Sequence, residues 1–120
     1  MDLYSEIILE HFKNPKNFGK LEKAQKSELG KNTSCGDSIF LELEIEDGKI
    51  KDIAFSGQGC AISIAAMSML SEKIKGLSLN EIDSLDQNFI KDLLKIDIGP
   101  GRIKCAMLGL ETLKKAIKDA

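Results

Sequence analysis

Three cysteines and one aspartate are the residues of this 120-residue chain whose types and positions could support metal or sulfur chemistry. Cys35, Cys60 and Cys105 each lie near a glycine, a residue that lets the backbone approach a ligand closely. Sulfur-rich sites with four ligands suit zinc or iron–sulfur clusters. Cysteine is also a common small apolar core residue, so residue type alone leaves both interpretations open.

Asp37 follows Cys35 with only Gly36 between them. Residues two apart in extended backbone point the same way, so the Asp37 carboxylate could join the Cys35 thiolate in one site. Three thiolates and one carboxylate would then make a four-ligand shell. The alternative is that Asp37 is a turn or capping residue, which is a frequent role for aspartate.

The elements that must position these residues are predicted from hydrophobic spacing and turn residues. An alternating strand over 38–46 leads through the two-residue turn Asp47-Gly48 to its partner strand, which we expect the glycines of 57–59 to break. The predicted elements are a helix over 2–13, strands over 22–33, 38–46 and 49–56, and helices over 60–74, from 78, over 86–95 and over 102–118.

All three cysteines therefore fall at the ends of predicted elements, where a binding site is more usual than a core position. Cys60 begins one helix, and Cys105 lies in the first turn of another. Free N–H groups and the helix dipole favour the thiolate there, which is the form that binds metal and attacks sulfur. Boundary positions thus favour a ligand role for the cysteines over a packing role. We expect the three thiols at exposed loop tips, with Asp37 in a surface loop.

Strands grouped before helices predict an α+β fold, a small three-stranded antiparallel sheet with helices packed on one face. The length fits a single domain over residues 1–120. A net charge of −2 argues against nucleic acid as a partner, and no apolar run is long enough for a membrane span. An odd number of cysteines and no apparent secretory leader lead us to expect reduced thiols and a cytoplasmic protein.

Four segments of the chain, taken in order, resemble segments of a known protein family. They are residues 4–15 (YSEIILEHFKNP), 32–37 (NTSCGD), 55–63 (FSGQGCAIS) and 102–108 (RIKCAML). Together they resemble the IscU/SufU family of iron–sulfur scaffold proteins, which is related to the N-terminal domain of NifU. The match covers nearly the whole chain, and three of the segments each contain one cysteine.

The resemblance implies a scaffold or carrier rather than an enzyme. It implies that sulfur arrives as persulfide from a pyridoxal-phosphate-dependent cysteine desulfurase, with Cys35 as the candidate acceptor. It also implies a transient [2Fe–2S] cluster, zinc in the isolated protein, and transfer of the cluster to apo iron–sulfur recipient proteins. The matched ligand positions are Cys35, Asp37, Cys60 and Cys105.

Two departures from the family pattern bear on these expectations. Lys104 stands where IscU-type members usually have histidine, which is similar to the SufU branch, although this chain is short before that motif. The alternative function is therefore a SufU-type zinc-dependent sulfur acceptor, a sulfurtransferase partner of the desulfurase. A third function, a purely structural zinc domain, is disfavoured because such sites are often built from paired Cys-x-x-Cys motifs, which this sequence lacks. Residues 97–101 lack the Leu-Pro-Pro-Val-Lys pattern that recruits the dedicated Hsp70 chaperone, which makes that chaperone a doubtful partner.

Two further residues could be taken for site residues. His11 is the chain's one histidine, and its position on the apolar line of the first helix favours packing or surface exposure over metal binding. Lys104 could pair with a carboxylate of the site or of a partner, or it could be a solvated surface lysine.

Overall fold

The computed structural model describes residues 3–34 and 36–118. Their order of one helix, three strands and four helices is the one that the sequence predicts. The elements are α1 (Leu3–Lys13), β1 (Lys26–Asn32), β2 (Asp37–Glu46), β3 (Lys49–Gln58), α2 (Ala61–Ile74), α3 (Leu79–Asp83), α4 (Gln87–Leu94) and α5 (Ile103–Ile117).

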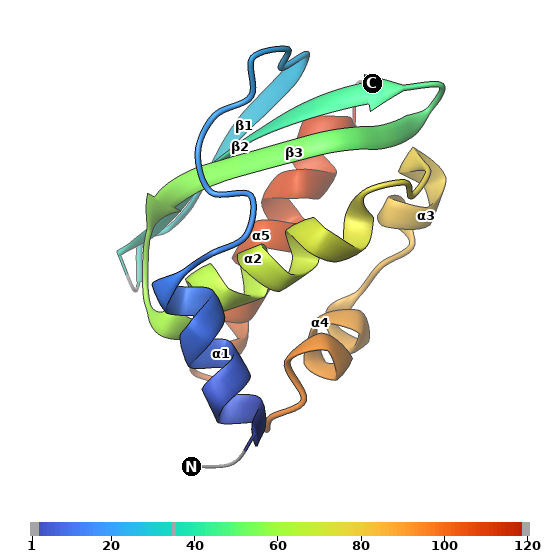
Figure 1. The fold of residues 1–120 in the computed structure, drawn as a ribbon. Coiled ribbons are helices and arrows are strands. Elements are labelled where there is room, and N and C mark those ends of the chain that lie inside the picture. The colour runs from blue at the N-terminus through green and yellow to red at the C-terminus, as the bar shows by residue number, and fades with distance from the viewer. Residues whose placement is uncertain (1–2, 35, 119–120) are drawn as a thin grey trace.

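The three strands form one antiparallel sheet in the order β1-β2-β3, and the helices lie on one face of it (Figure 1). The predicted α+β fold class is confirmed. Side chains alternate along β2, so that Asp37, Ile39, Leu41 and Leu43 are all buried on the helix side. Phe40 points to the open face and is 36% exposed. The alternation thus fixes which side chains of β2 face the helices.

The Asp47-Gly48 turn joins β2 to β3 as predicted. Glu46 pairs with Lys49, and the two residues between them have φ values of +55° and +73°. Positive φ at both central positions gives the turn a twist that matches the paired strands. This tight connection fixes the register in which β3 runs back along β2.

β3 ends within the predicted break at residues 57–59, but two residues later than expected, because the strand continues through Gln58. Gly57 pairs with Ile39 at a φ of +145°, and a Cβ on Gly57 would lie 2.1 Å from the carbonyl oxygen of Ser38. The glycine allows two strands to approach closely, where the sequence suggested a strand end. As a result, β3 delivers Gly59 and Cys60 to the beginning of β2.

Helices α2 and α5 form the layer directly beneath the sheet, and α1 packs against α2 (Figure 1). Helix α2 is buried along most of its length, as expected for a helix that is apolar nearly all round. Its fully buried side chains include Ala65, Met67, Leu70 and Ile74. They belong to a core cluster that also contains residues of β2, β3, α4 and α5. Two cysteine-bearing segments, the start of α2 and the start of α5, are thus anchored in one core.

The connector after α1 covers the outer edge of β3. Phe55 N donates to Asn17 O at 2.9 Å, and Gly19 N donates to Phe55 O at 2.8 Å. His11 Nδ1 lies 2.7 Å from the Ser68 hydroxyl of α2. His11 therefore has the packing role that its helical position favoured, within a polar network that joins α1 to α2.

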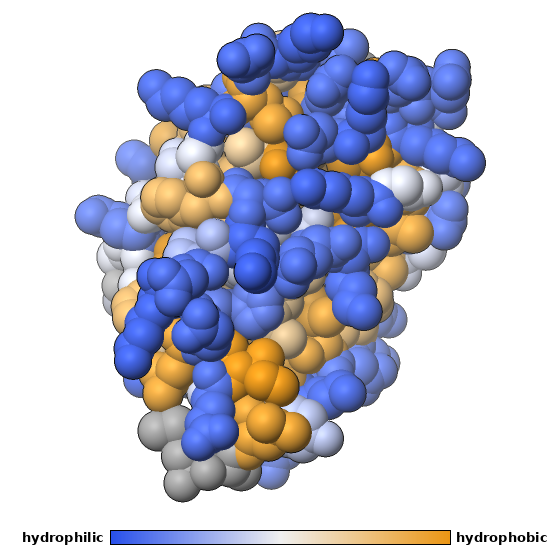
Figure 2. Space-filling view, in the orientation of Figure 1, coloured by the Kyte–Doolittle hydropathy of each residue, from blue (hydrophilic) through white to orange (hydrophobic). Residues whose placement is uncertain are grey.

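The surface carries hydrophilic residues over most of the face in Figure 2, with apolar residues exposed around α1 and α4. A groove there is lined by Tyr4, Ile7, Met69, Phe89 and Leu93, among others. Within residues 3–34 and 36–118, no helix combines the length and the apolar content that a membrane span requires.

Candidate metal centre

Asp37 is the first residue of β2 and pairs with Asn32 at the end of β1. It occupies the inward row of the strand and is only 2% exposed. Its Oδ1 accepts a hydrogen bond from Cys60 N at 3.1 Å, while its buried Oδ2 has no hydrogen-bond partner among the described residues. The expectation that Asp37 sits in an exposed loop is wrong, because the strand turns its side chain under the sheet.

The prediction for Cys35 falls outside the described residues, because position 35 is not among them. Its neighbour Gly36 has a φ of +73°, which is left-handed and not extended backbone. The expectation that extended backbone would align the side chains at positions 35 and 37 therefore has the wrong premise. Whether Cys35 joins the site stays a prediction.

Cys60 is the N-cap of α2, as predicted. Its backbone is extended, with φ −73° and ψ 170°, and its Sγ accepts from Ser63 N at 3.5 Å. The side chain is half-buried. The Cys60 sulfur therefore lies at the start of α2, where the free N–H groups of the helix point. The Asp37 carboxylate, which accepts a hydrogen bond from the backbone N–H of Cys60, lies beside it.

Cys105 lies in the first turn of α5 and is 1% exposed. Asn32 Nδ2 lies 4.0 Å from its Sγ and is oriented as a donor. The sequence suggested three cysteines at exposed loop tips, and burial of Cys105 contradicts this. The apolar stripe of α5 runs into its first turn, so the helix carries the thiol inward as it docks beneath the sheet.

The three described candidates converge on one point. One ligand atom each from Asp37, Cys60 and Cys105 lies within 4.8 Å of the other two. The residues come from β2, the N-cap of α2 and the first turn of α5, which are far apart in sequence. Two sulfurs and one carboxylate oxygen are donors that zinc and iron accept. The buried Oδ2 without a partner is a further fit, because a bound metal would satisfy it.

Gly59 and Ser63 complete the surroundings of the carboxylate, and sequence reasoning missed Ser63. A Cβ on Gly59 would lie 2.8 Å from Asp37 Oδ1 and 3.0 Å from Ser63 Oγ. Ser63 is 1% exposed, and its hydroxyl has no hydrogen-bond partner among the described residues. A serine three residues after Cys60 inside an apolar run was the signal available in the sequence.

Lys104 is exposed at the start of α5. It lines a small cavity with Lys31, Asn32, Leu108 and Glu111, on the side of β1 that faces α5. Asn32 belongs both to this cavity and to the surroundings of Cys105. Lys104 is therefore exposed on the Cys105 side of the centre, and whether it pairs with a carboxylate stays a prediction.

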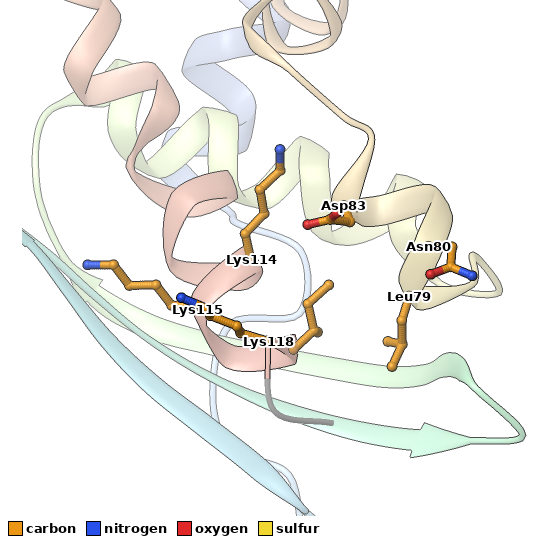
Figure 3. Close-up of a pocket in the computed structure, with 7 residues that line it drawn as sticks. Leu79, Asn80, Asp83, Lys114, Lys115 and Lys118 are labelled. Atoms are coloured by element: carbon orange, nitrogen blue, oxygen red, sulfur yellow. The ribbon is translucent and has the colours of Figure 1, made fainter.

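A different pocket lies at the other end of α5 (Figure 3). It is lined by Lys114, Lys115, Ile117 and Lys118 from the end of α5 and by Leu79, Asn80 and Asp83 of α3. It contains no thiol, and lysines in the last turn of a helix complement its dipole. Along α5, at 1.5 Å per residue, the lining residues Lys114 and Lys118 lie roughly 14 Å and roughly 20 Å from Cys105. This pocket is therefore separate from the candidate metal centre.

Comparison with known proteins gives one consistent family. The family model described as the NifU-like N-terminal domain matches residues 3–120. The iron–sulfur cluster assembly scaffold protein IscU of Thermotoga maritima is 42% identical, over 97% of this chain and 93% of its own length. The zinc-dependent sulfurtransferase SufU of Bacillus subtilis is 35% identical, over 96% of this chain and 89% of its own length.

Among solved structures, a protein from Fervidobacterium islandicum superposes with a TM-score of 0.82 and 35% identity. The alignment covers 95% of this chain and 96% of that one. That protein is described as a candidate iron–sulfur cluster assembly scaffold for the SUF system. Sequence and structure comparisons thus agree over nearly the full length of the chain.

Proposed function

The chain belongs to the NifU-like N-terminal domain family, and from that premise we propose that it is a scaffold for iron–sulfur cluster assembly. It would receive sulfur from a cysteine desulfurase, hold a transient [2Fe–2S] cluster as cargo, and pass it to apo-proteins. The convergence of Asp37, Cys60 and Cys105 within 4.8 Å is the observation that carries this proposal. The scaffold name of the Thermotoga maritima relative supports it.

The proposed ligands are Cys35, Asp37, Cys60 and Cys105. Cys60 and Cys105 supply soft sulfur donors from two rigid helix ends, which suits a site that must hold a defined geometry. Asp37 supplies a harder and weaker donor for cluster iron, and the Cys60 N–H fixes its orientation at 3.1 Å. A mixed donor set of this kind favours cargo that can be assembled and then released.

The proposed partners follow from the same chemistry. A persulfide of a pyridoxal-phosphate-dependent desulfurase would be attacked by the Cys35 thiolate at its outer sulfur. An S–S bond then forms at Cys35, and the donor's thiolate leaves. Recipient apo-proteins would accept the finished cluster. We expect this work in a reducing compartment such as the cytoplasm, because the three cysteines must stay reduced.

A second candidate function is a zinc-dependent sulfur acceptor. The name of the Bacillus subtilis relative favours it, as does Lys104 immediately before Cys105. In that case zinc would be the resident metal on the same residues, and it would act by holding their thiolates in place. The two candidates share a site and differ in what the site carries.

Anaerobic reconstitution with iron and sulfide separates these functions. A scaffold should develop the absorption of a [2Fe–2S] cluster and transfer it to an apo-ferredoxin. A sulfur acceptor should instead accelerate a cysteine desulfurase and carry persulfide on one cysteine, which mass spectrometry detects. Failure to form and transfer a cluster would exclude the scaffold function.

Removal of metal by a chelator is expected to leave the fold in place. The buried core runs through β2, β3, α2, α4 and α5, and most of it lies away from the site. A bound metal would add stability as RT ln(1 + [L]/Kd), so the thermal midpoint should fall without a loss of secondary structure at room temperature. Far-UV circular dichroism with and without EDTA tests this. Complete unfolding would instead indicate a structural zinc domain.

The change Asp37→Ala tests the weak-ligand role. In a scaffold we expect slower transfer to apo-ferredoxin and a longer-lived cluster, provided that an outside group fills the vacated position. In a zinc-dependent acceptor we expect weaker zinc binding and less stimulation of the desulfurase. The apo fold should persist, because the change removes a buried carboxylate with one unsatisfied oxygen. Unchanged transfer and stimulation rates would remove Asp37 from the site.

A further inference from the structure

Two buried side-chain atoms without a hydrogen-bond partner stand out among the described residues, and both belong to the candidate metal centre. They are Asp37 Oδ2 and Ser63 Oγ. The side chains are 2% and 1% exposed, respectively. Buried polar groups in folded proteins nearly always have a partner, so each exception calls for an explanation. A metal explains Asp37 Oδ2 and leaves the Ser63 hydroxyl to be explained.

Helix packing gives no reason for a hydroxyl at position 63. Ser63 lies in the first turn of α2, and the segment that follows, Ile64–Met67, is buried and apolar. An alanine would fill the same position without burying an unsatisfied hydroxyl, and serine is also the poorer helix former. The N-cap contact does not need the hydroxyl, because it is the backbone N–H of Ser63 that donates to Cys60 Sγ.

The hydroxyl lies next to the carboxylate. Asp37 Oδ1 and Ser63 Oγ lie 2.8 Å and 3.0 Å from the point where a Gly59 Cβ would be, so both border the same small space. Because Gly59 has no side chain, that residue leaves the space that both oxygens border unfilled by a Cβ. Oδ1 already accepts one hydrogen bond, from Cys60 N, and a carboxylate oxygen can accept a second.

We propose that Ser63 is a positioning residue for Asp37. Its hydroxyl donates to the Asp37 carboxylate, directly or through one water, when Oδ2 binds a metal. The hydrogen bond holds the carboxylate in its ligating orientation. Carboxylates that bind metals are commonly held by such hydrogen bonds, and loss of one typically weakens metal binding about 10- to 100-fold. The inference rests on the proposed function, because it assumes that Asp37 is a ligand.

The inference is tested by the zinc affinity of the Ser63→Ala variant. This affinity is measured under reducing, anaerobic conditions by competition with a chromophoric chelator. We expect zinc binding to weaken by about tenfold or more. The visible spectrum of the Co²⁺-substituted protein should change with it, because the carboxylate changes its orientation toward the metal. Thermal unfolding of the apo-protein should show an unchanged or higher midpoint, since the variant no longer buries an unsatisfied hydroxyl.

Ser71→Ala is the matched control. Ser71 lies on the same helix and is fully buried, but its hydroxyl is satisfied: it donates to Ser68 O at 2.7 Å and accepts from Asn17 Nδ2 at 2.9 Å. We expect this variant to lower the apo thermal midpoint and to keep zinc affinity. The two serine changes should therefore have opposite effects. Equal loss of zinc affinity in both variants would overturn the inference, because it would indicate general loosening of α2.

A double-mutant cycle separates a role through Asp37 from a direct role at the metal. In an Asp37→Ala background, Ser63→Ala should cause no further loss of zinc affinity. An equal loss in both backgrounds would overturn the inference, as would zinc affinity within twofold of wild type in the single variant. Either result would leave the proposed site standing if Cys60→Ser still weakens binding. If wild type itself binds neither Zn²⁺ nor Co²⁺, the proposed function fails and the inference with it.

Discussion

Cys60→Ser is expected to weaken zinc binding by a hundredfold or more while α2 stays intact. Apparent zinc-binding free energies of about 10–16 kcal/mol, shared among four ligands, give roughly 3 kcal/mol for each, and 1.4 kcal/mol is a factor of ten. Serine is among the best N-cap residues, so its hydroxyl can accept from Ser63 N where the thiol now does. The variant therefore separates the ligand role of Cys60 from its capping role.

The measurement combines chelator competition for zinc affinity with thermal unfolding of the apo-protein. His11→Ala is the control, because histidine is the other residue type that zinc favours. His11 contacts Ser68 and Glu72, and its loss should reduce stability without changing zinc affinity. Unchanged affinity in Cys60→Ser would remove Cys60 from the site. A large loss in His11→Ala would mean that the ligand set is drawn from the wrong residues.

Gly57→Ala is expected to destabilise the fold by about 3 kcal/mol or more, which is a large part of a typical domain's 5–15 kcal/mol. The residue has a φ of +145°, and a Cβ there would lie 2.1 Å from the Ser38 carbonyl oxygen. The clashing atom is backbone, so β2 and β3 must separate where they approach Asp37 and Cys60. Zinc affinity should therefore fall together with stability.

Gly19→Ala is a close control for the cost of placing an alanine at a positive φ. Its φ of +137° is similar, but a Cβ at Gly19 would meet nothing within 4 Å. We expect Gly19→Ala to lower the free energy of unfolding only by the cost of the strained backbone, about 1–3 kcal/mol. Zinc affinity should be unchanged. Urea unfolding of both apo-variants measures the difference. Equal losses for the two alanines would show that the contact with Ser38 has no energetic weight.

The sequence by itself determined the order of the elements and indicated the candidate ligand residues. The Asp47-Gly48 turn, the alternation along β2 and the long apolar run of α2 are local patterns, so they could be interpreted without knowledge of the packing. The same holds for Cys60 and Cys105 at helix starts, which the structure places as predicted. Each of these features is specified by residues close together in the sequence, so short-range patterns were sufficient to predict it.

Only the tertiary structure decided how the site is enclosed. An aspartate after a glycine reads as a turn residue, and it is the pairing of Asp37 with Asn32 that sets the row of β2 in which it lies. The docking of α5 then buries Cys105, and the docking of α2 places Ser63 beside the carboxylate. Likewise, Gly57 is typical of a strand end in the sequence, and only the structure shows that it lies within β3 in close contact with the backbone of Ser38. These features depend on contacts between segments distant in sequence, whose register and depth are fixed only when the sheet and helices pack together.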